Sequence, residues 1–419
     1  MTDDRIALDP ARIRELFDLR QLGGGFEEDP YPAWHRLRES GPLHEGTVGR
    51  LIGFDGPETF FGLPEPERPH FSAFDFETCD AIIRDSDVFR MSPPDPDDKL
   101  GLYQTSMLTM DGDRHRRYRA LVQPSFYPER MPWWTKNWIQ PTVEALIDSF
   151  ESNGRADLNV EFCAAIPVLT ICGSFGISVE DALDIRAAVS GVDQSPGSGR
   201  PGVGRFMEIL RPIVEARRAQ PQDDLISTLV QAELTEEGES HVLSDTDILS
   251  FSFLLLGAGS GTTWKQMGII LVTMLERPEW IEAVRRDHTL LHALIEESAR
   301  WMPTDPVFSR YVRKDVALHG IDIPAGAVVH QCYGAANRDP ARWERPDEFD
   351  PRRAPRKNLA FGRGAHTCLG KNLALTELVT AITALVDRLP NLRLDPDAEP
   401  PRIIGLYERA PTAVPAVWG

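Results

Sequence analysis

The chain of 419 residues is poor in several features that would point to particular classes of protein. Its five cysteines are scattered without paired spacing, so we expect neither a disulfide framework nor a zinc site of the CxxC type. The longest apolar stretch, residues 248–258, is well short of the ~20 residues that cross a bilayer. The first residues lack the charged-then-apolar pattern of a signal peptide. We therefore expect a cytoplasmic protein that does not enter a membrane.

Positive charge is also scarce, and the net charge of −19 argues against general affinity for nucleic acid. The basic residues that stand out form two islands. These are either solvated charged faces or a docking patch for an acidic electron-transfer protein. The first island spans residues 114–119, and the second contains Arg352, Arg353, Arg356, Lys357, Arg363 and Lys371. No break in composition, Gly/Ser linker or internal repeat divides the chain.

Hydrophobic periodicity predicts a mainly α protein with a minor β region. A proline-started helix is expected at 29–41, another at about 77–84, and a further one directly after residue 368. Strands are expected at 70–74 and, as short pieces, over 310–332. Residues 92–100 are too rich in proline for a helix, and residues 195–204 read as a loop. The remaining helices are expected at 140–152, 205–219, 224–234, 245–277 and 278–285.

The helix expected from residue 245 to 277 is the longest, and Ser244 and Asp247 provide a cap for it. At ~1.5 Å per residue it would be roughly 50 Å long and would cross the molecule. Its middle contains Gly257, Gly259 and Gly261, which cost on the order of 1 kcal/mol each relative to alanine. Either another helix packs closely there, or the helix opens beside a ligand and offers its hydroxyl groups to water or bound oxygen.

Cys368 lies in a glycine-rich run, Phe361-Gly-Arg-Gly-Ala-His-Thr-Cys-Leu-Gly370. A lone cysteine in such a turn is usually a small buried residue. Here five positions are fixed within ten residues, in the pattern Phe-x-x-Gly-x-His-x-Cys-x-Gly. The helix that starts after the run, together with His366 and Arg363, favours a thiolate. The run therefore predicts a buried thiolate that binds a metal.

The run resembles the haem-binding loop of the cytochrome P450 family, specifically the soluble haem-thiolate monooxygenases of bacterial type. The resemblance extends from about Asp29 to the C-terminus. It implies the cytochrome P450 fold, with a long central helix in a single haem-enclosing domain over residues 1–419, of which about 1–28 form an N-terminal extension. It implies haem b as the cofactor and Cys368 as the ligand of its iron, with Phe361 and Gly364 in contact with the haem.

The middle of the long helix resembles the oxygen-activation motif of the family, Ala-Gly-x-acid-Thr. The resemblance implies that Thr262 helps to deliver protons and that Ala258 contacts the haem. Gly261 occupies the position of the acid, a departure that affects the proton relay. Ser260, Thr263, ordered water or a group of the substrate could compensate. Alternatively, electron use is poorly coupled to product, or the reaction is not an ordinary hydroxylation.

Other matches to the family concern the haem propionates and the structural core. The resemblance implies that His115, Arg119, Arg310 and His366 hold the propionates, and that Asn358 keeps a hydrogen bond to the haem without a charge. Glu297 and Arg300, three residues apart, match the core pair of the family. Either Arg352 or Arg353 completes that pair.

The resemblance implies a monomeric monooxygenase that inserts one atom of dioxygen into a hydrophobic small molecule, by hydroxylation or oxidative dealkylation. A ferredoxin-type donor with its reductase would supply electrons, because no flavin or iron–sulfur domain is visible. Expected substrate contacts are Leu254, Val307 and Phe308, with the loop at 103–107. Alternatives are a haem-dependent isomerase or dehydratase, a peroxide-driven oxidation suggested by Gly261, and a non-catalytic haem-binding protein.

Overall fold

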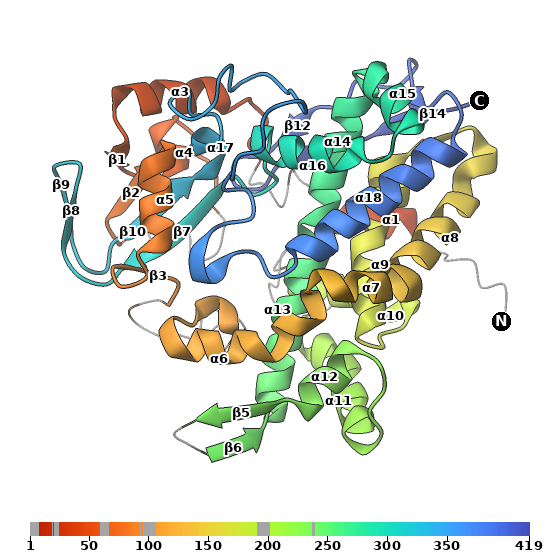
Figure 1. The fold of residues 1–419 in the computed structure, drawn as a ribbon, viewed down its shortest axis with the longest axis horizontal. Coiled ribbons are helices and arrows are strands. Elements are labelled where there is room, and N and C mark those ends of the chain that lie inside the picture. The colour runs from red at the N-terminus through yellow and green to blue at the C-terminus, as the bar shows by residue number, and fades with distance from the viewer. Residues whose placement is uncertain are drawn as a thin grey trace.

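Helices make up most of the molecule, and a small sheet region lies to one side of them (Figure 1). The computed structural model describes residues 8–18, 20, 25–58, 67–92, 94, 102, 106–190, 202–236 and 239–419. Most of the proline-rich segment at 92–100, most of the loop at 195–204 and residues 103–105 lie outside this part of the chain. The expectation of a mainly α protein with a minor β region is confirmed.

The sheet region is built on five strands in the order β1-β2-β10-β7-β3. β2 and β10 are parallel, and the other neighbours are antiparallel. All five residues of β10 are buried, as expected for a strand in the middle of a sheet. The strands predicted at 70–74 and within 310–332 are confirmed. Their bounds are β1 Leu43–Glu45, β2 His70–Ala73, β3 Phe89–Arg90, β7 Val307–Val312 and β10 Val328–Cys332, with a separate hairpin of β8 Val316–Leu318 and β9 Ile321–Ile323.

Short helices accompany this sheet: α3 Tyr31–Ser40, α4 Val48–Leu51, α5 Phe76–Arg84 and α17 Tyr333–Ala336. The helices predicted at 29–41 and 77–84 correspond to α3 and α5. Proline lies in the first turn of α3, and the N–H of Gly41 closes its end on the carbonyl of Leu37. The side chain of Asp75 caps α5 by accepting a hydrogen bond from the N–H of Thr78.

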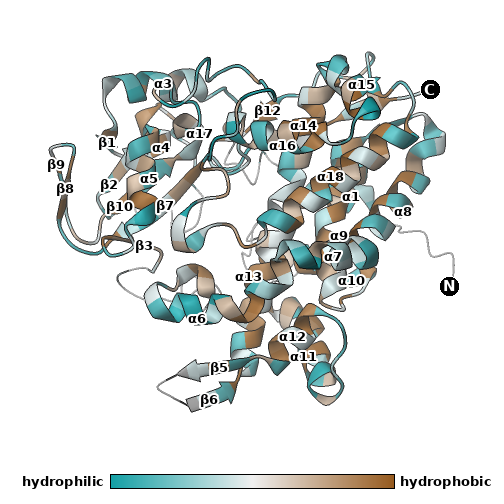
Figure 2. Ribbon diagram, viewed as in Figure 1, coloured by the Kyte–Doolittle hydropathy of each residue, from teal (hydrophilic) through white to brown (hydrophobic). Residues whose placement is uncertain are grey.

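The larger, helical part is held together by apolar side chains, which Figure 2 shows in brown along α14, in contrast to the hydrophilic α6. Every residue of α14 is buried. Its helices are α6 Gly112–Val122, α7 Met131–Trp134, α8 Gln140–Phe150, α9 Ala165–Ser174, α10 Val179–Val189, α11 Val203–Ala219, α12 Leu225–Gln231, α13 Asp245–Gly261, α14 Thr263–Leu275, α15 Pro278–Arg286, α16 Leu290–Trp301 and α18 Lys371–Arg388. Two π-helical turns, η5 Thr135–Ile139 and η7 Asn159–Cys163, precede α8 and α9.

The predicted single helix over 245–277 is two helices, and this corrects the expectation. α13 ends at Gly261, and α14 begins at Thr263. Thr262 between them has φ −112° and ψ −46°, outside regular helical values. The capping box at Ser244 and Asp247 is present as expected. The two helices run in line through the middle of the molecule (Figure 1).

Tight packing accounts for one of the three helix glycines. A Cβ atom on Gly259 would lie 2.9 Å from Ile171 Cγ1 on α9, so no side chain fits there. Close packing on α9 therefore explains Gly259, and the interruption at Thr262 agrees with the expected opening of the helix, whereas a ligand beside it stays a prediction.

The helix predicted at 224–234 is too long, because α12 ends at Gln231. The chain then turns into an antiparallel hairpin of β5 Glu233–Glu236 and β6 Glu239–Val242. Leu234 is buried there, 2% exposed, on a strand that is otherwise polar. A single buried leucine is compatible both with the last turn of a helix and with a strand of alternating polarity. The hydrophobic pattern of the sequence therefore does not distinguish the two structures here.

The N-terminal segment packs on the helical part. In α1 Pro10–Leu16 and the residue after it, Ile13, Leu16 and Phe17 are buried in the main core. The ring of Phe17 meets that of Trp264 edge-to-face at 5.2 Å. Part of the segment expected as an extension, residues 1–28, therefore contributes to the core.

The C-terminal part adds two small sheets beside the helices. β11 Arg393–Leu394 and β14 Pro415–Val417 join β4 Arg155–Asp157, and β12 Ile403–Ile404 pairs with β13 Ala410–Pro411. Within the described residues, one helical stretch, 364–388, is long and apolar enough on composition alone to span a membrane. Its buried side chains, including Leu378, Ile382 and Leu385, belong to the main core.

Candidate active site

The loop before α18 has the tight turn that its glycines predict. Gly362 and Gly364 have φ of +63° and +73°, a region that favours glycine. A Cβ atom on Gly364 would lie 3.4 Å from the carbonyl oxygen of Ile83. The N–H of Cys368 donates a 2.8 Å hydrogen bond to the carbonyl of Phe361 and closes the loop. The helix predicted after Cys368 begins at Lys371.

Cys368 differs from the other four cysteines, because they are buried and it is exposed. The burial predicted for Cys368 is that of a metal-bound thiolate, and it stays a prediction. Enough protein surrounds the sulfur that desolvation raises the pKa of the thiol, although the N–H of Gly370 and the charge of Arg119 oppose the shift. An accessible sulfur is what a metal ligand requires.

Four basic side chains that the sequence singled out gather near this loop. The rings of His115 and His366 stack with centroids 4.0 Å apart. Arg119 donates a 2.7 Å hydrogen bond to the carbonyl of Thr367, next to Cys368. Burial, followed by the charge of Arg310, lowers the pKa of His366, so Arg310, which is 6% exposed, lies near that ring. Residues from α6, β7 and the Cys368 loop thus meet at one place.

Asp111 is the acid of this basic cluster. Its carboxylate lies 3.7 Å from His366 and accepts hydrogen bonds from the N–H and hydroxyl of Ser92. Although burial opposes the effect, the interaction with His366, followed by the bonds from Ser92, holds the pKa of Asp111 well below its ordinary value. Burial, followed by the charges of His366 and Arg119, lowers the pKa of His115 to about 4. The cluster is therefore short of negative charge.

The buried Nδ1 atom of His115 has no hydrogen-bond partner among the described residues. Buried polar atoms are almost always paired, so an orphaned nitrogen in a cationic cluster fits an anionic ligand. Two carboxylates, such as the propionates of haem, have the charge that this cluster lacks. The residues present fit the cofactor that the sequence implied.

Asn358 and Phe361, which are also predicted to contact the haem, make contacts within or next to the loop. Asn358 accepts a 3.0 Å hydrogen bond from the N–H of Ala360, so its amide oxygen serves the local turn. The ammonium of Lys371 lies 4.9 Å from the centroid of the Phe361 ring. Contacts of Asn358, Phe361 and Gly364 with the haem stay predictions.

On α13, Ala258 has solvent-accessible surface, and this residue was predicted to contact the haem. Ala258 is exposed, although residues 248–256 before it are buried. The Thr262 hydroxyl donates to the carbonyl of Ala258, at 3.3 Å, and its own carbonyl accepts from the N–H of Lys265, at 3.1 Å. Ser260 is buried, 1% exposed, and donates to the carbonyl of Leu256 at 2.6 Å. Both hydroxyls therefore bond within the helix, but the bond of Thr262 is longer and lies at the break, whereas Ser260 is buried.

The comparisons with known proteins agree with this geometry. The family model described as "Cytochrome P450" matches residues 203–406. The cytochrome P450 monooxygenase PikC of Streptomyces venezuelae is 30% identical over 391 residues, covering 91% of this chain and 88% of PikC. This chain belongs to the cytochrome P450 family. Haem b is accordingly the cofactor of this P450, and the protein is a monooxygenase.

Two further relatives show how far the similarity extends. The mycinamicin IV hydroxylase/epoxidase of Micromonospora griseorubida is 30% identical over 354 residues, covering 82% of this P450 and 88% of that enzyme. The structure of the myxobacterial cytochrome P450 CYP267B1 in complex with myristic acid has a TM-score of 0.80 and 30% identity, covering 97% and 99% of the two chains. The P450 fold expected from the sequence is confirmed.

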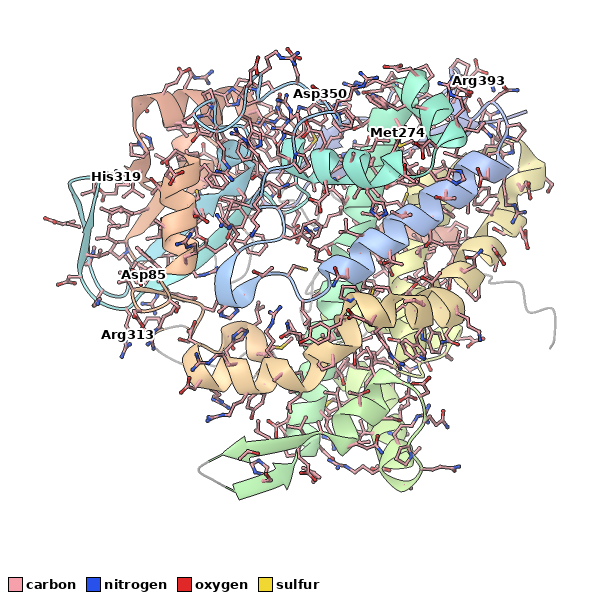
Figure 3. All side chains as sticks on the ribbon, in the orientation of Figure 1. Asp85, Met274, Arg313, His319, Asp350 and Arg393 are labelled. Atoms are coloured by element: carbon pink, nitrogen blue, oxygen red, sulfur yellow. The ribbon has the colours of Figure 1, made fainter. Side chains whose placement is uncertain are left out.

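The core pair of this P450 is completed by Arg353. Arg300 donates to both oxygens of Glu297 at 2.7 Å, and Arg353 Nε donates to Glu297 Oε1 at 3.0 Å. Asp350, labelled in Figure 3, adds a 2.9 Å hydrogen bond from its N–H to the same oxygen. Arg352 instead lies over the ring of Trp280 at 4.9 Å. The question that the sequence left open is answered by the hydrogen bonds.

The predicted substrate contacts lie mainly in the packed interior. Val307 is 0% exposed and Leu254 is 6% exposed, both within core clusters. Phe308 is half-buried and stacks on Tyr333 at 5.3 Å. A substrate role for these three stays a prediction. Sequence reasoning did not single out Lys265, a lone buried lysine in the apolar run after Thr262, whose ammonium donates 2.9 Å hydrogen bonds to Asp305 and Glu408.

Proposed function

We propose that this P450 hydroxylates or oxidatively dealkylates a hydrophobic small molecule, with Cys368 as the ligand of the haem iron. The observation that carries the proposal is the accessible Cys368 sulfur beside a cationic cluster in which His115 Nδ1 has no described partner. Bound haem supplies the activation of dioxygen, and thiolate ligation favours cleavage of the O–O bond. His115, Arg119, Arg310 and His366 would hold the propionates.

On the other side of the site, Thr262 would hold and transfer protons. Its hydroxyl lies at the interruption between α13 and α14, where the 3.3 Å bond to Ala258 is weak and easily exchanged. Gly261 has no carboxyl group that could return a proton to that hydroxyl, so protons have to come from water, from the substrate or from another residue. PikC and the mycinamicin enzyme are named for oxidation reactions, which supports an oxygen-insertion role here.

The electron donor would be a separate ferredoxin-type protein with its reductase. Of the second basic island, Arg353 is committed to Glu297, Lys371 lies 2.9 Å from Glu296, and Arg363 bonds to Asp80. Arg352 and Lys357 are exposed and are better candidates for docking. We also propose that the chain acts as a monomeric single domain in the cytoplasm.

Replacement of Cys368 by Ser tests the ligand assignment. A serine hydroxyl does not provide the soft sulfur donor, so the thiolate-type absorbance of the reduced carbonyl complex should be lost. Cys172→Ser, at a buried cysteine on α9, is the matched control and should retain that absorbance. An unchanged spectrum in Cys368→Ser would overturn the assignment.

A peroxide-driven oxidation is the second candidate, and Gly261 is the observation that favours it. Peroxide already carries the two electrons and the protons that the dioxygen route has to deliver, so a missing acid matters less. Single-turnover assays separate the two routes. Product from peroxide but never from dioxygen and reductant would reject the monooxygenase reaction as the physiological one.

A further inference from the structure

A buried ion triad of Lys265, Asp305 and Glu408 lies one helical turn beyond Thr262. Lys265 is 2% exposed, and its ammonium donates 2.9 Å hydrogen bonds to Asp305 Oδ1 and to Glu408 Oε2. Although burial opposes the effect, the two carboxylates raise the pKa of Lys265. The triad thus joins the start of α14, the coil between α16 and β7, and the turn between β12 and β13 (Figure 1).

The turn that carries Glu408 is held rigidly. The N–H of Arg409 donates a 2.7 Å hydrogen bond to the carbonyl of Thr304, and its guanidinium donates to the carbonyl of Gly405 at 2.6 Å. Gly405 has φ +97°, and a Cβ atom there would lie 1.8 Å from the carbonyl oxygen of Glu408. Only glycine fits this position, so the backbone of the turn is fixed at Glu408, and Lys265 holds the carboxylate of that residue.

The triad has one negative charge more than it has positive charge when both acids are ionised. Asp305 Oδ2 and Glu408 Oε1 have no hydrogen-bond partner within the described residues. The side chains of Asp305 and Glu408 are 14% and 25% exposed, compared with 2% for Lys265. The two carboxylates therefore have accessible surface, and the ammonium that holds them lies behind.

This surplus charge is unfavourable without a counterion. Burial, followed by the charge of Glu408, raises the pKa of Asp305 despite the opposing charge of Lys265. Taking up a proton is one way to remove the surplus. A cationic group of a ligand would remove it as well, and would bring two charge-assisted hydrogen bonds or ion pairs.

The triad also lies beside the site. The N–H of Lys265 donates to the carbonyl of Thr262 at 3.1 Å. The triad therefore connects to the helix break through Lys265, and Asp305 lies two residues before Val307, an expected substrate contact.

We propose that Asp305 and Glu408 form an ammonium-recognition subsite, so that the substrates of this P450 carry a protonated amine on an apolar skeleton. Lys265 is the positioning residue that holds both carboxylates. The inference rests on the proposed function, because the substrate has to enter the same interior. A molecule whose charged end is a carboxylate is disfavoured at this subsite, because it adds a negative charge to a surplus of the same sign.

Binding of three matched probes to the haem-loaded protein tests the inference. The probes share one apolar tail and end in a trimethylammonium group, its uncharged tert-butyl isostere or a carboxylate. A quaternary ammonium has no lone pair and does not ligate iron. Equilibrium dialysis should give a dissociation constant for the ammonium probe about tenfold lower than for the isostere, with the carboxylate weakest.

The Glu408→Gln variant keeps an oxygen acceptor for Lys265 but removes the surplus charge, so the preference should fall to about onefold. Asp305→Asn provides a second test if the first variant is unstable, and thermal midpoints of the haem-loaded variants check their folding. Glu144→Gln, on the exposed side of α8, removes the same charge far from the triad and should leave the preference unchanged.

The inference is wrong if the native protein does not bind the ammonium probe, binds it no better than the isostere, or keeps its preference in both triad variants. These outcomes are separable from failure of the proposed function. Turnover of neutral substrates without an ammonium preference overturns the subsite alone. An ammonium preference without any oxidation overturns the proposed reaction alone.

Discussion

Gly261 replaces the acid of the family motif, yet the residues around this position could still accommodate a carboxylate. A Cβ atom at this position would lie 3.2 Å from Arg186 Nη1, on α10. Arg186 is 4% exposed and lies over the ring of Phe17 at 4.8 Å. A guanidinium beside position 261 would stabilise an ionised carboxylate there. The departure from the motif thus concerns one side chain and not the environment around it.

We expect Gly261→Asp to raise the share of electrons that ends in product about tenfold if the native protein is poorly coupled, since a positioned acid contributes at least that much to proton transfer. Product and peroxide are measured against consumed reductant. Gly261→Asn is the uncharged control of similar size. The gain should vanish in the Thr262→Ala background, and equal behaviour of the Asp and Asn variants would contradict a proton-relay effect.

Between elements, one carboxylate holds together segments that are distant in the sequence. Glu297 and Arg300 on α16 are 6% and 2% exposed, and Arg353 reaches them from the coil that leads to the Cys368 loop. Arg300 also donates to the carbonyls of Asn337, Pro346 and Glu348. The position of the coil before the iron ligand thus depends on α16.

Neighbouring arginines of the same coil provide a matched test of this link. We expect Arg353→Ala to lower the free energy of unfolding by about 3 kcal/mol, because it leaves a buried Glu297 short of a partner. Arg352→Ala should cost less than about 0.5 kcal/mol, as for an exposed surface change. Denaturant titration of both haem-loaded variants measures the difference, and equal losses would show that the coil does not depend on Arg353.

Elements with strong local signals were predictable from sequence, and those decided by packing were not. The proline start and glycine end of α3, the Ser244 cap and the glycine-rich Cys368 loop are chemical signals within a few residues. The end of α13 at Gly261 was not predictable, because the apolar pattern continues through Trp264 and Met267. Pairing of Arg353 with Glu297 depends on three-dimensional position, so Arg352 and Arg353 were equally good candidates from the sequence alone.

The site shows the same division. The spacing of Phe361, His366 and Cys368 indicates the loop, and His115 and Arg119 share one helix face, so the basic cluster could be anticipated. The Lys265 triad could not, because its partners lie 40 and 143 positions further along the chain. No local pattern connects positions that only the folded chain brings together.

Across the whole molecule, the buried acid Glu377 on α18 makes stability depend on pH. Burial raises the pKa of Glu377 to about 8 from an ordinary value of 4.5, although the hydroxyls of Thr170 and Thr263 oppose the shift. The unfolded chain releases this proton at lower pH than the folded one. The native state is therefore favoured at low pH by this group, and that contribution is lost as the pH rises from about 4.5 through about 8.

We expect the free energy of unfolding to fall by about 3 kcal/mol between pH 5 and pH 8 through this group alone. Glu377→Gln should remove that part of the pH dependence and be relatively more stable at pH 8. Denaturant titrations of the haem-loaded protein across this range measure it, with Glu144→Gln as the exposed control. Parallel pH profiles for the native protein and Glu377→Gln would show that Glu377 does not titrate as expected.

The contact of Phe17 with Trp264 has a practical consequence. Trp264 lies two residues beyond Thr262, and the guanidinium of Arg186 lies over the ring of Phe17. The residue that follows α1 therefore packs next to the helix break. A shortened chain that starts at Asp29 would lack this packing. Poor coupling in such a chain would therefore report a loosened helix, and would not by itself assign the first residues a role in docking or transport.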